Sequence, residues 1–412
     1  MKNCGFIPTD ILIPASADMT KWSCVACDQY TSEPEYWRSV EKTVGDSVST
    51  LSLMLPEIYL DDSESRFEKI TKSMREYLNS GVFREIKDSF VYVERTLADG
   101  RVRRGLVGAI DLEIYDFSKD TKALCRPTEA TVTSRLPARV KVRAKAAVEM
   151  PHIMMLLNDP QKTVIEPYSE KKAALEKLYD FELMQSSGHI CGYRVHGKNV
   201  VLAMSAIEKL YADSEDETPM LYAMGDGNHS LAAAKQYYEM LKDKLGQKAK
   251  NHPARYALLE LVNLHDSSLD FEPIHRVLFD VDTDKFMREF ADFCGLKAGV
   301  HDGQIFTVII GKSEQKYTFT NPRGAVTVGN IQDFIDEYTK INGGKTDYIH
   351  GEEVVKTLAS QPRRIGFIVD GISKSSFFNV IKKDGILPRK TFSMGHAADK
   401  RFYLECRRIT TD

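Results

Sequence analysis

The residues best suited to chemistry lie in the segment Gly225–Ser230, with the sequence Gly-Asp-Gly-Asn-His-Ser. An apolar run precedes this segment, and apolar residues at helical spacing follow it, so the pattern predicts a strand that turns sharply into a helix. Gly225 and Gly227 allow backbone angles and close approaches that a Cβ would forbid. The first amides of the helix carry partial positive charge. The segment therefore predicts a site for a phosphate or carboxylate.

Polar side chains in this turn add possible chemistry. Asp226 is a candidate carboxylate base, and His229 is a candidate to hold a phosphate or to transfer a proton near neutral pH. Asn228 and Ser230 are candidate ligand-binding residues, but either residue could instead cap the helix, which is the commoner role. A functional turn and a purely structural turn both stay open.

Two known phosphate-binding motifs occur here in incomplete form. Gly225-x-Gly227-x-x-Ser230 lacks the third glycine of the dinucleotide fingerprint, and no strand with an acidic end follows at the usual distance. A P-loop-like run from Gly192 to Lys198 has Asn199 where a hydroxyl residue is needed, and we expect a strand rather than a helix after it. Neither known motif is therefore complete enough to predict a phosphate site in this chain.

The turn also resembles a family signature. Asp226–Ser230 is similar to the Asp-Gly-His-His-Arg turn of domain-of-unknown-function family 1015, with Asn228 and Ser230 in place of a histidine and the arginine. Further segments resemble the family in its order: 127–131, 151–154, 256–264, 273–276 and 387–391. The resemblance covers nearly the whole chain.

The same turn resembles the phosphate-binding turn of the ParB and sulfiredoxin-like superfamily, which includes free-serine kinases and cytidine-nucleotide switches. This resemblance implies a phosphate-bearing ligand, namely a nucleotide with Mg²⁺, and it implies that Glu129 or Asp28 acts as a base or magnesium ligand. Serine offers one neutral donor where arginine offers two charged ones. Arg276 or Lys390 would then supply the missing charge.

Because the resemblance spans both halves of the chain, we expect four distant residues to line the same cleft as Asp226. Glu129 is expected to assist catalysis, and the ligand-binding candidates are His275, Arg276 and Lys390. Local ion pairing is the alternative role for His275 and Arg276.

The amino-acid composition argues against several classes of function. With 56 basic and 59 acidic residues, the chain has no global electrostatic reason to bind nucleic acid or an anionic membrane. No apolar run is long enough to cross a bilayer, and seven scattered cysteines fit a reducing compartment, so we expect a cytoplasmic protein. Cys24 and Cys27 lack a second ligand pair, which argues against a zinc site there. The sequence gives no indication of oligomeric state.

A chain of 412 residues is too long to fold around a single hydrophobic core, so we expect two domains or one large divided domain. Strands and helices are interleaved, which predicts an α+β fold with mixed sheets, divided into regions 1–170 and 171–412. The clearest patterns are a helix around residues 67–77 and a hairpin of residues 90–96 and 102–110. We also expect a helix containing Ala174, Leu178 and Phe181, a second hairpin of residues 190–195 and 200–204, and a strand over residues 402–409.

These observations favour a phosphate- or nucleotide-binding protein, with a nucleotide-dependent phosphotransferase acting on a small polar metabolite as the specific hypothesis. Two alternatives are a non-catalytic nucleotide sensor and a structural protein in which the turn only packs a helix on a strand.

Overall fold

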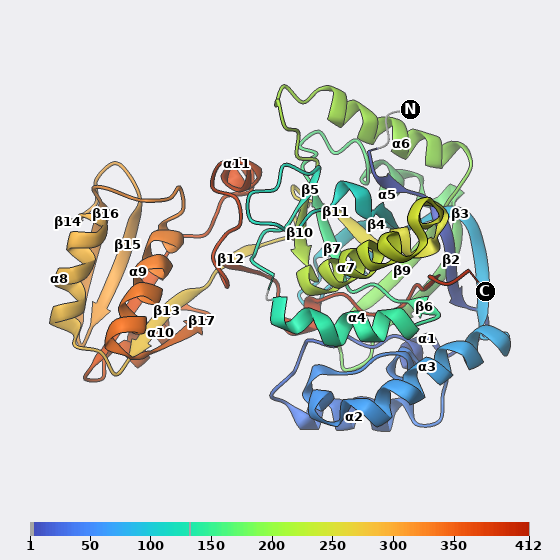
Figure 1. Cartoon of the computed structure of the whole chain (residues 1–412), viewed down its shortest axis with the longest axis horizontal. Coiled ribbons are helices and arrows are strands. Elements are labelled where there is room, and N and C mark those ends of the chain that lie inside the picture. The colour runs from blue at the N-terminus through green and yellow to red at the C-terminus, as the bar shows by residue number, and fades with distance from the viewer. Residues whose placement is uncertain (1–3, 132, 412) are drawn as a thin grey trace. The chain divides into compact units, whose positions relative to one another are not determined.

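A computed structural model shows that the chain forms two compact units (Figure 1). It describes residues 4–131 and 133–411, except for the side chains of residues 60–64 and 135. The first unit comprises Met1–Pro127, Thr131–Leu269 and Gly395–Asp412, and the second comprises Thr128–Ala130 and Asp270–Met394. The chain crosses between the units at these borders, and the division into regions 1–170 and 171–412 stays a prediction. The expected α+β class is confirmed.

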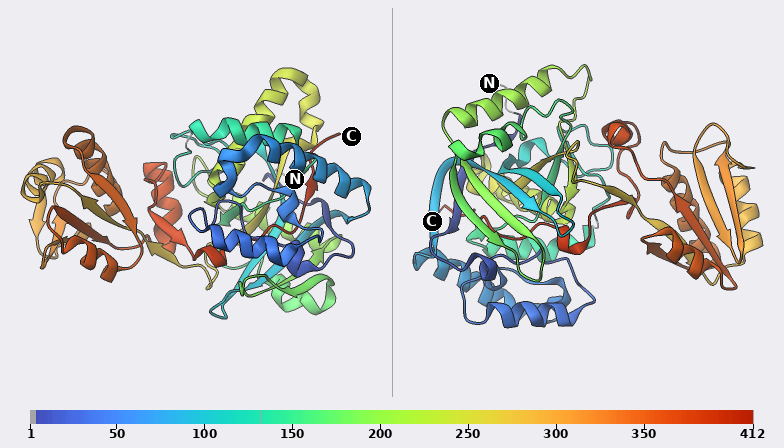
Figure 2. Two further views of the ribbon diagram at one scale, coloured as in Figure 1. Left: turned by 90° about the horizontal axis from the view of Figure 1, so that it is seen from below. Right: turned by 180° about the vertical axis from the view of Figure 1, so that it is seen from behind.

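The first unit is built on a mixed sheet. Among the described residues its order is β5-β10-β7-β11-β4-β3-β9-β8, with β1 beside β4 and β2 beside β3. The strands are β1 (Phe6–Ile7), β2 (Thr9–Pro14), β3 (Phe83–Thr96), β4 (Val102–Asp111), β5 (Cys125–Arg126), β7 (Met154–Leu157), β8 (Glu176–Glu182), β9 (His189–Val195), β10 (Tyr222–Asp226) and β11 (Tyr256–Asn263). The view from behind in Figure 2 shows the long cyan and green strands side by side. A short pair, β6 (Val148–Glu149) and β20 (Arg407–Arg408), ties the C-terminal tail to this unit.

Helices cover both faces of this sheet, because its strands alternate between two apolar cores. On β3, Phe90 and Tyr92 join one core with α6 and α7, whereas Val91 and Val93 join the other with α2 and α3. The helices are α1 (Met19–Trp22), α2 (Pro34–Val44), α3 (Ser63–Asn79), α4 (Leu136–Lys145), α5 (Pro167–Lys171), α6 (Lys198–Ala212) and α7 (Asn228–Leu245). The predicted helix around residues 67–77 and the predicted hairpin are confirmed as α3 and as β3 with β4.

Three sequence-based predictions in this unit are wrong. Residues 200–204 belong to α6, whose buried Val200, Ala203 and Ile207 have helical spacing, so no second hairpin forms. Ala174, Leu178 and Phe181 do not share a helix, since 176–182 form β8 against β9. Within 402–409 the only described strand is β20, and Phe402 and Cys406 form isolated bridges with Val25 and Leu12.

A helix does follow the P-loop-like run, contrary to our expectation, yet the motif still fails. Gly192 lies inside β9, and the ring of Tyr179 occupies the space where its Cβ would be. The residues that would form a phosphate loop are therefore strand as far as Val195.

The second unit contains a six-stranded antiparallel sheet in the order β14-β16-β15-β18-β13-β17 and a two-stranded sheet of β12 and β19, counted over the described residues. A cluster of phenylalanines forms much of its core. Its strands are β12 (Phe271–Pro273), β13 (His275–Phe279), β14 (Leu296–Ala298), β15 (Ile305–Ile310), β16 (Ser313–Phe319), β17 (Lys345–Ile349), β18 (Arg364–Val369) and β19 (Phe392–Met394). Its helices are α8 (Thr283–Cys294), α9 (Thr327–Asn342), α10 (Glu352–Ala359) and α11 (Lys374–Asp384). Across the described parts of both units, no helix combines the length and apolar character needed to cross a membrane.

Candidate functional site

The predicted strand-turn-helix is present in the first unit. β10 ends at Asp226 and α7 begins at Asn228, with Gly227 between them. The pairing of β10 with β7 shifts register between Met224 and Asp226, which redirects the chain at Gly225. Gly227 has a φ of 79°, and a Cβ there would lie 3.0 Å from the Cα of Ile153. Both the left-handed angle and this close approach therefore require glycine.

The start of α7 is not capped by a side chain. Gly227 is the N-cap residue, so Asn228 and Ser230 lie inside the helix and the capping alternative is wrong. Gly227 N donates to Asp226 Oδ1 at 2.8 Å, and the amides of Ser230 and Leu231 donate to Gly227 O. Asn228 Oδ1 is buried and has no hydrogen-bond partner among the described residues. A buried acceptor is thus left over at the positive end of the helix.

A lysine from the C-terminal tail pairs with the turn. Lys400 Nζ lies 3.3 Å from Asp226 Oδ2, and their side chains are 14% and 19% exposed. The tail reaches this position because it runs beside residues 24–26, where Ala26 N donates to Arg401 O at 3.0 Å. Lys400 therefore brings a positive charge to a turn in which serine replaces the family's arginine.

A buried histidine contacts the first turn of α7. His152 precedes β7, and the pairing of Met154 with Asp226 brings it alongside the helix. Its Nε2 lies 3.1 Å from Ser230 Oγ, and its Nδ1 lies 2.8 Å from the Tyr403 hydroxyl. Burial raises the pKa of Tyr403 well above its usual value, so this hydroxyl stays protonated. A histidine tautomer that accepts from Tyr403 at Nδ1 donates from Nε2 to Ser230.

Asp28 completes this group of polar side chains. Burial raises its pKa, but the positive charge that His152 carries when it is protonated, a hydrogen bond from Gln29 and the charge of Lys400 outweigh that effect and leave the pKa below its ordinary value. Asp28 is therefore a carboxylate at neutral pH. We call Asp28, His152, Asp226, Ser230 and Lys400 the turn cluster. It combines two carboxylates, an imidazole, a hydroxyl and an ammonium group at a helix start.

Buried arginines hold the segments that carry this cluster. Arg95 Nη2 donates to Ala398 O at 2.9 Å, and Arg103 Nη1 donates to Asp399 O at 2.7 Å. Arg401 Nε donates to Pro151 O at 3.1 Å, next to His152. Charge-assisted hydrogen bonds of this kind are stronger than neutral ones. They fix the backbone on both sides of Lys400 and beside His152.

The other predicted turn residue, His229, is half-buried in the second position of α7.

The remaining predicted site residues belong to the second unit. Arg276 is fully buried, where it donates to Gln332 Oε1 and to the carbonyl oxygens of Ile274 and Arg389.

Two other predicted site residues, Glu129 and Lys390, are joined by a hydrogen bond. Lys390 N donates to Glu129 Oε1 at 3.1 Å. His275 Nδ1 accepts from Val369 N at 3.3 Å, and burial lowers the pKa of His275. A common cleft of Glu129, His275, Arg276 and Lys390 with Asp226 stays a prediction, since Asp226 belongs to the first unit.

His152, Lys400 and Tyr403 were not predicted as site residues. Each is separated from the turn by at least 70 positions, so no local spacing links them to it. His152 lies in a segment that resembles the family, which was the only available signal. Lys400 lies in a tail that had been expected to form a strand.

A family model described as "Protein of unknown function (DUF1015)" matches residues 8–338. A search of curated proteins finds no match. Among solved structures, the chain is similar to a free serine kinase in complex with AMP, with a TM-score of 0.37 and 12% identity over 73% of this chain and 90% of that one. It is also similar to a conserved hypothetical protein from Pyrococcus furiosus, with a TM-score of 0.36 and 12% identity over 73% of this chain and 94% of that one.

A further similar structure is SbnI with a C-terminal truncation from Staphylococcus aureus, with a TM-score of 0.29 and 11% identity over 60% of this chain and 82% of that one. The family match spans most of the sequence and includes the resembling segments 127–131, 151–154, 256–264 and 273–276, whereas segment 387–391 lies beyond it. The chain belongs to the DUF1015 family.

Proposed function

We propose that the first unit binds a phosphate-bearing ligand at the start of α7 and that the protein is a nucleotide-dependent phosphotransferase acting on a small polar metabolite. The observation that carries this proposal is the ion pair of Lys400 with Asp226 beside an uncapped helix start. The helix dipole and the ammonium group both favour a phosphate there. The two together supply the charge neutralisation that phosphoryl transfer needs.

The unpartnered acceptor of Asn228 supports a ligand with a hydrogen-bond donor. A buried carbonyl oxygen without a partner costs free energy, and a hydroxyl or amino group on the ligand would remove that cost. Nucleotides and small polar metabolites both carry such groups. A bare anion does not.

The turn cluster also contains a base for the reaction. The acceptor hydroxyl would give its proton to Asp226, its oxygen would bond to the terminal phosphorus, and the bond from that phosphorus to the bridging oxygen would break to release the nucleoside diphosphate. Asp28 and Asp226 are the carboxylates that fit a magnesium ion, and Mg²⁺ would neutralise phosphate charge. Lys400, near both carboxylates, would then move from Asp226 to the phosphate.

Ligand stabilisation followed by a turnover assay tests this function. Adenine, guanine and cytidine nucleotides with Mg²⁺ are added with and without small amino and hydroxy acids, and a ligand of the native state must raise the unfolding temperature. Asp226→Ala should abolish turnover with a modest loss of binding, and His229→Ala should weaken binding. Asp243→Ala, on an exposed position of the same helix, is the matched control and should change neither.

The same measurements separate the alternatives. Binding without turnover, weakened by Asp226→Ala, would assign the protein as a sensor. An unchanged unfolding temperature with every phosphate-bearing compound, together with full stability of the Asp226 and His229 variants, would overturn the proposal in favour of a structural turn.

A further inference from the structure

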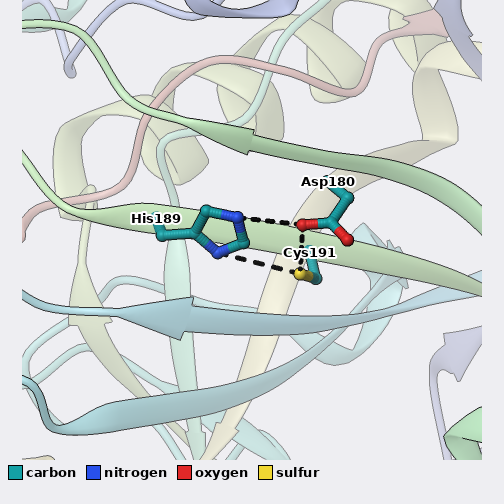
Figure 3. A group of neighbouring side chains, drawn as sticks. All are labelled: Asp180, His189 and Cys191. Atoms are coloured by element: carbon teal, nitrogen blue, oxygen red, sulfur yellow. Dashed lines mark hydrogen bonds and ion pairs between the residues drawn. The ribbon is translucent and has the colours of Figure 1, made fainter.

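A second group of reactive side chains lies on the β8–β9 hairpin, outside the turn cluster. Asp180 on β8 is directly opposite Cys191 on β9, and His189 lies two residues before Cys191. Because side chains alternate along a strand, all three project from the same face of the sheet, as Figure 3 shows. Among the described residues β8 is at the end of the strand order, so the three side chains lie at the edge of the sheet.

The three side chains already contact one another. Cys191 Sγ lies 3.0 Å from Asp180 Oδ1, and His189 Nε2 lies 2.9 Å from the same oxygen (Figure 3). His189 Nδ1 lies 3.8 Å from Cys191 Sγ. One oxygen, one nitrogen and one sulfur atom, one from each residue, lie within 4.8 Å of one another. Zinc bonds of about 2.0–2.3 Å place neighbouring ligand atoms roughly 3.3–3.8 Å apart, so small side-chain movements suffice.

We propose that Asp180, His189 and Cys191 bind a borderline-soft divalent metal ion, with Zn²⁺ as the best match, through a carboxylate oxygen, an imidazole nitrogen and a thiolate sulfur. Mixed sulfur, nitrogen and oxygen ligands favour zinc over magnesium or calcium, which prefer oxygen alone. Three protein ligands leave a fourth tetrahedral position for solvent or a substrate atom. The imidazole turns so that one of its nitrogens faces the ion.

Neighbouring charges agree with this assignment of ligands. Lys177 Nζ binds the other oxygen of the carboxylate, Asp180 Oδ2, at 2.6 Å, so Oδ1 remains directed at His189 and Cys191. Glu94 is opposite Cys191 on β3, but Lys172 holds its carboxylate at 2.7 Å, which removes it as a fourth ligand. On metal binding the Cys191 thiol loses the proton that it now shares with Asp180, and this proton passes to solvent.

This zinc site was not predicted, because Cys24 and Cys27 were the only pair whose spacing along the chain suggested zinc ligands. His189 and Cys191 are two positions apart, and Asp180 reaches them only through the pairing of two strands. Residues 176–182 had been expected to lie partly in a helix, which hid the cross-strand arrangement.

Metal titration of the whole protein tests the site. The protein is stripped with a chelator, and Zn²⁺ binding is measured by competition with a chromophoric chelator, while Co²⁺ binding is followed by absorption. We expect one tight equivalent of Zn²⁺ and, with Co²⁺, a thiolate-to-cobalt charge-transfer band. Cys191→Ser should abolish that band, and His189→Ala and Asp180→Asn should each weaken Zn²⁺ binding by at least about tenfold.

Two control variants make the result specific. Cys27→Ser removes another half-buried cysteine, and His196→Ala removes an exposed histidine just after β9, so both should bind like the wild type. Circular dichroism shows whether each variant is folded. Failure of the folded wild type to bind Zn²⁺, or a charge-transfer band that survives Cys191→Ser and disappears in Cys27→Ser, would overturn the proposal. Neither outcome depends on the function of the turn cluster.

Discussion

The turn cluster and a second ionic group, which we call the Glu149 clamp, use similar side chains in opposite ways. The Glu149 clamp consists of Glu149, Arg143 and Arg407, of which Glu149 and Arg407 are nearly fully buried and Arg143 is 14% exposed. Glu149 Oε1 accepts from Leu258 N and from Arg407, and Glu149 Oε2 pairs with Arg143 at 2.6 Å. Burial raises the pKa of Glu149, but the two arginines outweigh it, so the pKa is below its ordinary value. Both carboxylate oxygens are fully used by the protein.

The turn cluster is less complete. Lys400 and Asp226 make one ion pair at 3.3 Å with both side chains partly exposed, and Asn228 Oδ1 next to them has no partner among the described residues. Charge alone therefore does not mark a functional site. A carboxylate whose two oxygens both have partners joins β6 to β20 and holds the tail, whereas a cluster beside an unpartnered acceptor keeps groups available for a ligand.

Breaking the Glu149 clamp should have the largest effect on stability. Glu149→Ala leaves two buried guanidinium groups without their carboxylate, and we expect the free energy of unfolding to fall by about 3–5 kcal/mol. Urea unfolding measures this change. Glu85→Ala, which removes an exposed partner of Lys87, is the control and should cost about 0–1 kcal/mol. Equal losses in the two variants would contradict the structural role of the clamp.

A substitution in the turn itself should have an intermediate effect. Gly227→Ala forces a Cβ into a left-handed conformation and against Ile153, at a cost of roughly 2–3 kcal/mol. Gly81→Ala shares the positive φ but has open space around it, so it should cost only about 1–2 kcal/mol. Thermal unfolding of both variants isolates the contact with Ile153. A smaller loss for Gly227→Ala than for Gly81→Ala would show that this contact is not tight.

Removing the lysine of the turn cluster should have the smallest effect on stability. Lys400→Ala breaks a single, partly exposed ion pair, and we expect the free energy of unfolding to change by about 1 kcal/mol or less. Denaturant unfolding in the absence of any ligand is the measurement. A loss as large as that of Glu149→Ala would mean that Lys400 serves the fold, and the contrast between the two groups would disappear.

Local patterns in the sequence predicted the elements that carry the site, but not the residues that gather around it. The turn at Gly225–Ser230 was visible because glycine spacing and helical periodicity are local signals. His152, Asp28 and Lys400 meet the turn through strand pairing and through the path of the tail, which no periodicity encodes. Residues 200–204 were misread because β-branched residues in a short apolar run are compatible with either a strand or a buried helix face.

A crystal structure of the protein grown with a non-hydrolysable nucleoside triphosphate analogue and Mg²⁺ tests most directly whether the turn cluster binds phosphate. We predict that the terminal phosphate lies at the start of α7, within hydrogen-bond distance of the Asn228 amide and of Lys400 Nζ. The ion pair of Lys400 with Asp226 should be broken or lengthened in that structure. A nucleotide bound elsewhere on the molecule, with the turn cluster unchanged, would contradict the account.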